Sequence, residues 1–130
     1  DGKLSRGLGD VYKRQPENWL VDLLEEKMTE LRAVTLLSGD VFLQCHKTGD
    51  RLRKRFQAQL VDMESAAVAQ AAAKFRIPFL AIRSVSDLVG EHPEGVPVSQ
   101  LKQASRAAAA SVMKVLEMLP SEIAAETEVG

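Results

Sequence analysis

VDMESAAVAQAAAKFRIPFLAIRSVSD, the stretch from Val61 to Asp87, decides the fold class of this chain. Leu60 to Met63 is a short apolar run that is typical of a strand, and the alanine-rich segment from Glu64 to Phe75 predicts a helix. Phe79 to Val85 is a second, nearly continuous apolar run, as expected of a parallel strand that is covered on both faces. Strand, helix and strand in this order predict a parallel α/β unit with a right-handed crossover.

Acidic side chains stand where both predicted strands end. Asp62 and Glu64 close the first apolar run, and Asp87 closes the second. Ligands of α/β proteins gather at the carboxyl ends of the strands, so these carboxylates suggest a site that binds hydroxyl groups and moves a proton. Structural roles stay open as well, because Glu64 could stabilise the dipole of the following helix and Asp87 could form a turn or a cap. Arg83, inside the second run, needs an acidic partner or a polar cavity, since a buried unpaired charge is costly.

The segments on either side extend the same alternation. Apolar residues recur at helical spacing after Pro16. Ala33 to Leu37 predicts a short buried strand, and Thr48 to Phe56 predicts a charged helix with Thr48 as its N-cap. Leu88 to Pro97 contains two glycines and two prolines and predicts a loop, which leads into a long helix over Val98 to Leu119.

The two ends of the chain differ from its middle. Asp1 to Gln15 is polar, glycine-rich and without periodicity, and GLGDVYKRQ within it resembles a translated sequencing-adapter scar. We therefore expect residues 1–15 to be a non-native or disordered leader. Residues 16–119 are expected to form one partial domain, and residues 120–130 a flexible tail.

Composition narrows the classes of function. The 130 residues leave room for one domain, and a formal net charge of −1 argues against a nucleic-acid partner. The cations from Lys47 to Arg55 are interrupted by Asp50 and predict a solvated helix face rather than a phosphate groove. No apolar run approaches the roughly 18 residues that a membrane span needs. His46 and His92 are too scattered for a metal site. Cys45 is the one cysteine, has no motif that activates it, and suggests a reducing cytoplasm.

VDMESAAVAQ, FRIPFLAIRSVSD and SGDVFL together resemble the carboxyl-terminal signature of the nucleoside phosphorylase and nucleosidase superfamily. They are most similar to the bacterial 5′-methylthioadenosine/S-adenosylhomocysteine nucleosidases, and the resemblance runs from about Leu31 to about Leu119. It implies the carboxyl-terminal half of a phosphorylase/hydrolase-like three-layer α/β/α domain with a mainly parallel sheet. The other half would carry the first strands, a glycine-rich loop and the carboxylate that activates water.

The resemblance also implies a role for each acidic or basic residue of the signature. Asp87 is expected to act as the general acid that delivers a proton to N7 of the purine, which would otherwise leave as a poor anion. Glu64 is expected to bind the 2′- and 3′-hydroxyls of the ribose, because a carboxylate accepts two hydrogen bonds at once. Arg83 is expected near the attacking water, and Asp62 is expected to neutralise it, although the family often has glutamate at this position.

Three apolar residues complete the implied site. Phe42 is expected to stack on adenine, and the backbone of Leu43 is expected to pair with the base. Met63 is expected to pack its thioether against the sugar. A phenylalanine after a turn and a methionine after a strand are otherwise common core residues, so without the resemblance these two positions would be assigned to the core.

The implied parent protein is a cytoplasmic, homodimeric N-glycosyl hydrolase that releases adenine without a cofactor or metal and belongs to methionine salvage. Two enzymes of the same fold are alternatives: a purine nucleoside phosphorylase, which would require inorganic phosphate, and a futalosine hydrolase, which a substrate panel would identify. A third alternative is a truncated half-domain that is not catalytic, because half a parallel sheet leaves an open strand edge and exposed apolar faces.

Overall fold

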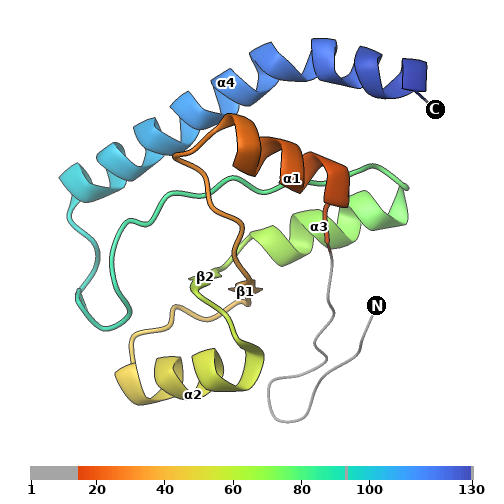
Figure 1. Ribbon diagram of the computed structural model, residues 1–130. Helices are drawn as coiled ribbons and strands as arrows, with labels where there is room; N and C mark the ends of the chain where they lie inside the picture. The colour runs from red at the N-terminus through yellow and green to blue at the C-terminus, as the bar shows by residue number, and fades with distance from the viewer. Residues whose placement is uncertain (1–14, 93, 130) are drawn as a thin grey trace. The chain divides into compact units, whose positions relative to one another are not determined.

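The computed structural model describes residues 15–92 and 94–129, with side chains as far as Ser121 (Figure 1). The predicted leader therefore lies, apart from Gln15, outside the described residues. The described chain divides into two compact units, one of residues 15–42 and 61–81 and one of residues 43–60 and 82–129.

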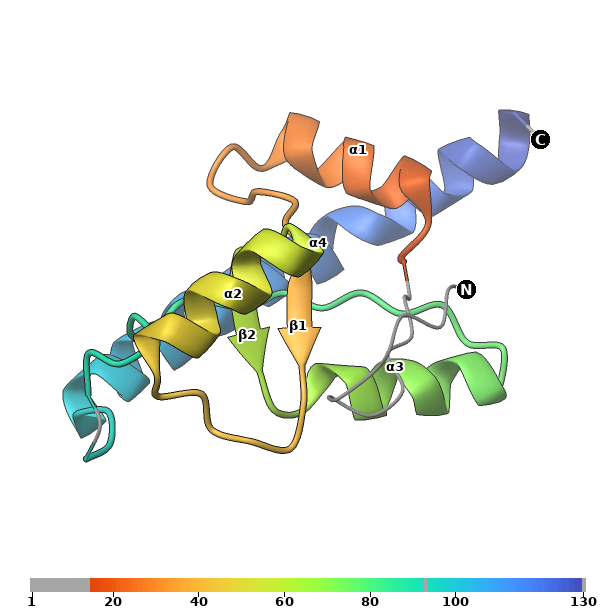
Figure 2. The same cartoon turned by 90° about the horizontal axis from the view of Figure 1, so that it is seen from below.

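The first unit contains the sheet. It holds helix α1 (Asn18–Lys27), strand β1 (Leu36–Ser38) and helix α3 (Ser65–Lys74), and strand β2 (Leu60–Asp62) lies almost wholly within it. β1 and β2 are hydrogen-bonded neighbours, and they run in the same direction (Figure 2). Helix α3 packs against β1. A small parallel sheet with helices confirms the predicted α/β class.

Most of the predicted elements of this unit form, with one shift. α1 begins at Asn18, shortly after Pro16, and α3 differs from its predicted bounds by one residue at each end. The prediction of a strand over Ala33 to Leu37 was wrong at its start, since β1 comprises only Leu36–Ser38. Because β2 is only three residues long, its hydrogen bonds with β1 do not extend to the residues before Leu36.

Helix α3 ends in a Schellman motif. The amide of Ile77 donates to the carbonyl of Ala72 over 2.8 Å, and the amide of Arg76 donates to that of Ala73 over 3.1 Å. Arg76 adopts a left-handed conformation with φ of 56°, which glycine tolerates far better than other residues. The motif ends the helix and pairs two of its last carbonyl groups.

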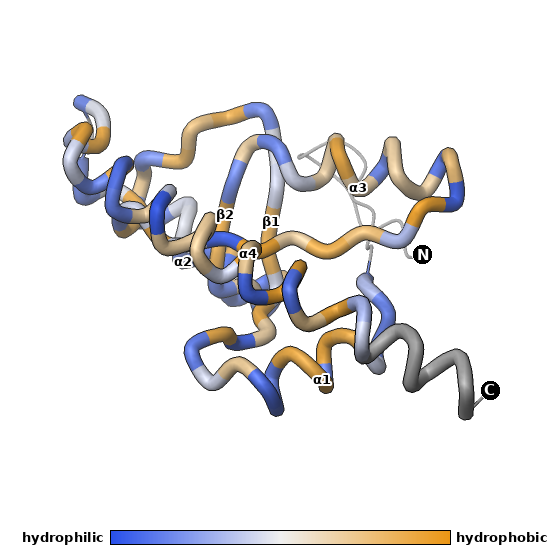
Figure 3. The backbone as a smooth tube through the Cα atoms, turned by 90° about the horizontal axis from the view of Figure 1, so that it is seen from above, coloured by the Kyte–Doolittle hydropathy of each residue, from blue (hydrophilic) through white to orange (hydrophobic). Residues whose placement is uncertain are grey.

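The predicted strand over Phe79 to Val85 does not form. This segment has neither helix nor strand, although it is markedly apolar (Figure 3), and the boundary between the two units falls between Ala81 and Ile82. A strand requires ladder hydrogen bonds with a neighbour, and in the described ranges the sheet consists of β1 and β2 alone. The expected burial on both faces was also wrong, because Val85 is 57% exposed.

The second unit contains helices α2 (His46–Phe56) and α4 (Val98–Val129). α2 begins two residues before the predicted Thr48, and its N-cap is Cys45, whose carbonyl accepts the first helical bond from the amide of Gly49 at 2.9 Å. The assignment of Thr48 as N-cap was therefore wrong. The residues from Leu88 to Pro97 have turns but neither helix nor strand where they are described, as predicted.

Helix α4 is longer than predicted. It was expected to end at Leu119, but it continues to Val129 with Pro120 inside it. Half of the ten residues after Pro120 are the strong helix formers alanine and glutamate, which are compatible with continuation of the helix. Whether residues 120–130 are flexible stays a prediction.

The core is small. The buried apolar side chains are Leu24, Met28, Ala58, Ala69 and Val115, and among the residues whose side chains are described none is less than 2% exposed. Large apolar side chains such as Phe75 and Leu88 are about 70% exposed. Val115, on the predicted apolar side of α4, is buried, whereas Leu116 on the same side is exposed.

Replacing Arg76 with glycine is expected to stabilise the first unit. The left-handed backbone at this position is strained for arginine, so the free energy of unfolding should rise by up to about 1 kcal/mol. Arg106→Gly is the matched control, because Arg106 lies exposed within α4. There glycine should lower the free energy of unfolding by about 1 kcal/mol. Chemical denaturation measures both, and a loss of stability in Arg76→Gly would contradict the Schellman geometry.

Gly90→Ala is expected to destabilise the second unit. An added methyl group would lie 2.5 Å from Nε2 of His46 and 2.9 Å from the carbonyl oxygen of Gln44, and the φ of Gly90 is +82°. The backbone strain alone costs about 1–2 kcal/mol. Gly95→Ala is the control, because Gly95 has φ of +119° but no atom within 4 Å of the added methyl group. Equal losses of unfolding free energy in the two variants would refute the packing of Gly90 against His46.

Candidate active site

In the first unit, the turn after β2 carries three of the predicted site residues. Asp62 ends the strand and is half-buried, whereas Met63 and Glu64 are exposed. The strand ends here because the side chain of Asp62 starts the next helix: its Oδ1 accepts a hydrogen bond from the amide of Ser65 at 3.2 Å, and its Oδ2 accepts one from the hydroxyl of Ser65. Asp62 therefore caps α3.

Glu64 occupies the N-cap position of α3 but makes no side-chain capping bond. Glu64 lies at the N-terminus of α3, where the helix dipole favours a carboxylate, so the structural alternative for Glu64 stays open. The side chains of Met63 and Glu64 are both exposed. An exposed carboxylate can accept hydrogen bonds from hydroxyl groups. The predicted pairing of Asp62 with Arg83 and the ribose contacts of Met63 and Glu64 stay predictions.

Ser38 holds the start of α3, which follows the candidate residues, and sequence reasoning missed this contact. Its hydroxyl accepts a hydrogen bond from the amide of Ala66 at 3.0 Å, and the amide of the next residue, Gly39, donates to the carbonyl of Asp62 at 3.1 Å. The end of β1 is thereby fixed to both β2 and α3. Ser38 lies 28 residues from its partner, so the local sequence carries no signal for this contact beyond a polar residue at a strand end.

Phe42 follows this junction and belongs to the first unit, whereas Leu43 is the first residue of the second unit. Phe42 is 46% exposed, so it is not the core residue that an isolated phenylalanine would suggest. Leu43 is half-buried. An exposed aromatic ring is available for stacking, but the predicted contacts of Phe42 and Leu43 with adenine remain predictions.

In the second unit, Asp87 is half-buried and held by its neighbour. The hydroxyl of Ser86 donates to Oδ1 of Asp87 over 2.7 Å, and the carbonyl of Ser86 accepts a hydrogen bond from Nε2 of Gln100 over 2.8 Å. Oδ2 of Asp87 makes no hydrogen bond within residues 15–92 and 94–121. Ser86 and Gln100 are further residues that the sequence did not reveal.

Asp87 is not the turn or helix cap that the sequence left open. The amide of Leu88 donates to Oε2 of Glu91 over 3.3 Å, and the turn is closed by the amide of Glu91, which donates to the carbonyl of Leu88 over 3.0 Å. Glu91 thus performs the local structural role. Arg83 lies upstream in the same unit and is exposed.

The loop after Asp87 packs against the start of α2. Besides the contact of Gly90 with His46, Cγ1 of Val89 lies 3.3 Å and Cδ2 of Leu43 lies 3.9 Å from where a β-carbon on Gly49 would be. The absence of a side chain at Gly49 therefore permits this approach. As a result, Leu43 and the residues that follow Asp87 both lie beside the first turn of α2.

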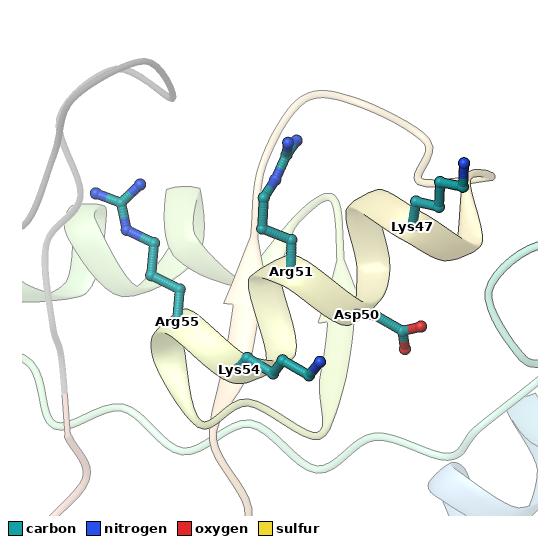
Figure 4. A pocket seen from close by; sticks show the side chains of 5 residues that line it. All are labelled: Lys47, Asp50, Arg51, Lys54 and Arg55. Carbon is teal, nitrogen blue, oxygen red and sulfur yellow. The ribbon is translucent and has the colours of Figure 1, made fainter.

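Two of the hollows on the described surface are lined by no predicted site residue. One, of about 610 Å³, follows the basic face of α2 and is lined by Lys47, Asp50, Arg51, Lys54 and Arg55 (Figure 4). Its side chains are exposed, as predicted for a solvated helix face. The other, of about 240 Å³, lies beside α3 and is lined mainly by alanine, proline and other apolar residues.

Cys45 is exposed at the N-terminus of α2. Hydrogen bonds from Thr48, first its backbone and then its side chain, hold the pKa of the exposed Cys45 thiol below its usual value. The histidines and acidic residues of the described chain form no cluster of three that could hold a metal ion.

The helices in the same ranges include none that is both long and apolar enough to cross a membrane.

Comparisons with known proteins connect the chain to named relatives. It is 41% identical over 86 residues to the 5'-methylthioadenosine/S-adenosylhomocysteine nucleosidase of Mycobacterium tuberculosis, which covers 66% of this chain and 32% of that protein. The nucleosidase of the same name from Bacillus velezensis is 31% identical over 119 residues, covering 87% of this chain and 51% of that protein. For the one from Bacillus subtilis, the identity is 33% over 106 residues, or 77% and 46% of the two chains.

The chain thus spans about a third to a half of the length of these curated relatives. The resemblance expected from the SGDVFL, VDMESAAVAQ and FRIPFLAIRSVSD segments is confirmed by these comparisons. The sequence pattern of the phosphorylase superfamily matches residues 6–119. The chain therefore belongs to the phosphorylase superfamily.

Proposed function

We propose that this chain is the part of a purine nucleosidase that binds the ribose and protonates the leaving base. The substrates would be 5′-methylthioadenosine and S-adenosylhomocysteine, the compounds in the names of its relatives. The reaction would be hydrolysis of the N-ribosidic bond with release of adenine. It would need no cofactor or metal, and the parent protein would be a cytoplasmic homodimer of methionine salvage.

The observation that carries the proposal is the state of the Asp87 carboxyl group. Its Oδ1 is held by the hydroxyl of Ser86, while local capping is left to Glu91. This leaves Oδ2 for a ligand, with its direction fixed by the bond at Oδ1. A carboxyl group in this position can hydrogen-bond N7 of a purine and supply the proton that the departing base requires.

The residues after β2 support the sugar half of the reaction. The exposed carboxylate of Glu64, which does not cap α3, would accept hydrogen bonds from the 2′- and 3′-hydroxyls of the ribose. Met63 would cover the sugar, and Phe42 with the backbone of Leu43 would bind the adenine ring. As positive charge develops on the sugar, an anionic Glu64 would stabilise it.

Arg83 favours hydrolysis over phosphorolysis within this superfamily by resemblance, because nucleosidases are expected to place an arginine near the attacking water. None of the site residues proposed here is the carboxylate that would activate this water. The basic hollow on α2 could suggest a phosphate site, but it includes Asp50 and is not formed by any of the residues proposed here to bind the nucleoside. Hydrolysis therefore remains the preferred reaction.

Asp87→Asn is expected to abolish adenine release while leaving nucleoside binding nearly intact. The amide keeps the hydrogen-bonding shape but cannot donate the proton, and loss of a general acid lowers the rate by about 10²- to 10⁴-fold. The assay uses a fusion of the chain to the amino-terminal region of the Bacillus subtilis relative. Asp22→Asn, on the exposed surface of α1, is the control and should keep full activity. Near-normal turnover by Asp87→Asn would exclude Asp87 as the acid.

The isolated 130-residue chain is expected to release no measurable adenine and to self-associate. The group that activates water is absent from the proposed site, and exposed apolar side chains such as Phe75 and Ile77 favour association. Adenine release is measured by chromatography, and association by analytical ultracentrifugation over a range of concentrations. A purified monomer with robust nucleosidase activity would show that this chain supplies every catalytic group.

A further inference from the structure

Two successive hydrogen bonds connect helix α4 to the side chain of Asp87. Gln100 lies in the first turn of α4 and is half-buried, and its Nε2 donates to the carbonyl oxygen of Ser86 over 2.8 Å. The hydroxyl of the same Ser86 donates to Oδ1 of Asp87 over 2.7 Å. Ser86 is therefore held at its backbone by Gln100 and in turn holds the carboxyl group of Asp87. All three residues belong to the second unit.

This connection matters because no ladder or helix fixes the backbone before Asp87. Residues 77–88 contain neither helix nor strand. After Asp87, the chain is fixed by the turn between Leu88 and Glu91 and by the packing of Gly90 against His46. Before Asp87, the side-chain amide of Gln100 links the carbonyl of Ser86 to helix α4. Asp87 thus lies between two anchored points of the second unit.

We propose that Gln100 is a positioning residue for Asp87, a role that rests on the proposed function of Asp87 as general acid. The carbonyl of Ser86 belongs to the peptide group that joins Ser86 to Asp87, so a bond to this oxygen restricts the rotation of that group. It thereby sets the direction in which the Asp87 side chain leaves the backbone. A general acid must lie within hydrogen-bonding distance of its target atom, and a displacement of about 1 Å can lower the rate by about 10²-fold.

The test compares Gln100→Met with Gln103→Met in the full chain. Methionine keeps the length and helix propensity of glutamine but has no N–H donor. Gln103 lies exposed on the same helix and is the matched control. Two readouts report on the site: hydrogen exchange of the Leu88 amide and the NMR resonance of the Asp87 carboxyl carbon.

In Gln100→Met, exchange at Leu88 should become about fivefold faster, as loss of one neutral hydrogen bond implies, and the Asp87 carboxyl resonance should move. Gln103→Met should change neither. Unchanged readouts in Gln100→Met, or equal changes in both variants, would overturn the proposal. Exchange of amides in the middle of α4 verifies that the helix is intact. If Gln100→Met unfolds α4, Gln100→Glu, which keeps the side-chain length, is scored by the same readouts.

A double-mutant cycle separates positioning from a general loss of stability. The proposed path runs through the hydroxyl of Ser86, so in a Ser86→Ala background Gln100→Met should shift the Asp87 resonance much less than in the wild-type chain. An equal shift in both backgrounds would show that Gln100 does not act through Ser86 and would refute the path.

Titration with adenine keeps this inference distinct from the proposed function. If the wild-type chain binds adenine, Gln100→Met should weaken the affinity about fivefold and Gln103→Met should not, and equal affinities in both variants would contradict the positioning role. If the wild-type chain binds no adenine, that result counts against the proposed function of the chain. The exchange and resonance measurements still decide whether Gln100 positions Asp87.

Discussion

The interaction on which the first unit depends is the capping of α3 by side chains from the ends of both strands. The first amides of a helix lack partners within it, and burying them unpaired is costly. Here the carboxylate of Asp62, at the end of β2, accepts a hydrogen bond from the amide of Ser65. The hydroxyl of Ser38, at the end of β1, accepts one from the amide of Ala66. One cluster of polar groups therefore ends both strands, starts the helix and joins all three elements. The turn between Asp62 and Ser65 has its two ends fixed by these bonds.

The sequence predicted the helices better than the sheet. Helical spacing and alanine content located α1 and α3 closely, because helix formation depends mainly on residues within a few positions of each other. The segment from Phe79 to Val85 has the composition of a buried parallel strand but pairs with neither β1 nor β2. A strand depends on neighbours that are distant in sequence, and the chain covers about a third to a half of the length of its relatives. An apolar run is thus not sufficient for a strand.

The same difference applies to the candidate site. The acidic candidates were proposed because predicted strand ends in α/β proteins face the ligand, and the family resemblance gave each of them a role. In the structure only Asp62 ends a strand, since the segment before Asp87 forms none. The residues that hold them were not found, since Ser38 lies 28 positions from Ala66 and Gln100 lies 14 positions from Ser86. Serine and glutamine are common surface residues, so nothing in their local sequence distinguishes a positioning contact from an exposed side chain. Such contacts follow from the fold and become visible only with it.

The two carboxylates proposed to carry the chemistry share one feature: a neighbouring acid makes the capping hydrogen bond next to each of them. Asp62 caps α3, although Glu64 occupies the N-cap position. Glu91 accepts the amide of Leu88, although Asp87 is the residue directly before it. A carboxylate that caps a helix or turn has its oxygens engaged by amides and is a poor hydrogen-bond acceptor for a ligand. At each position a second acid makes the local capping hydrogen bond. Glu64 still lies at the N-terminus of α3, where the helix dipole favours a carboxylate, so its structural role and its proposed role in binding are compatible.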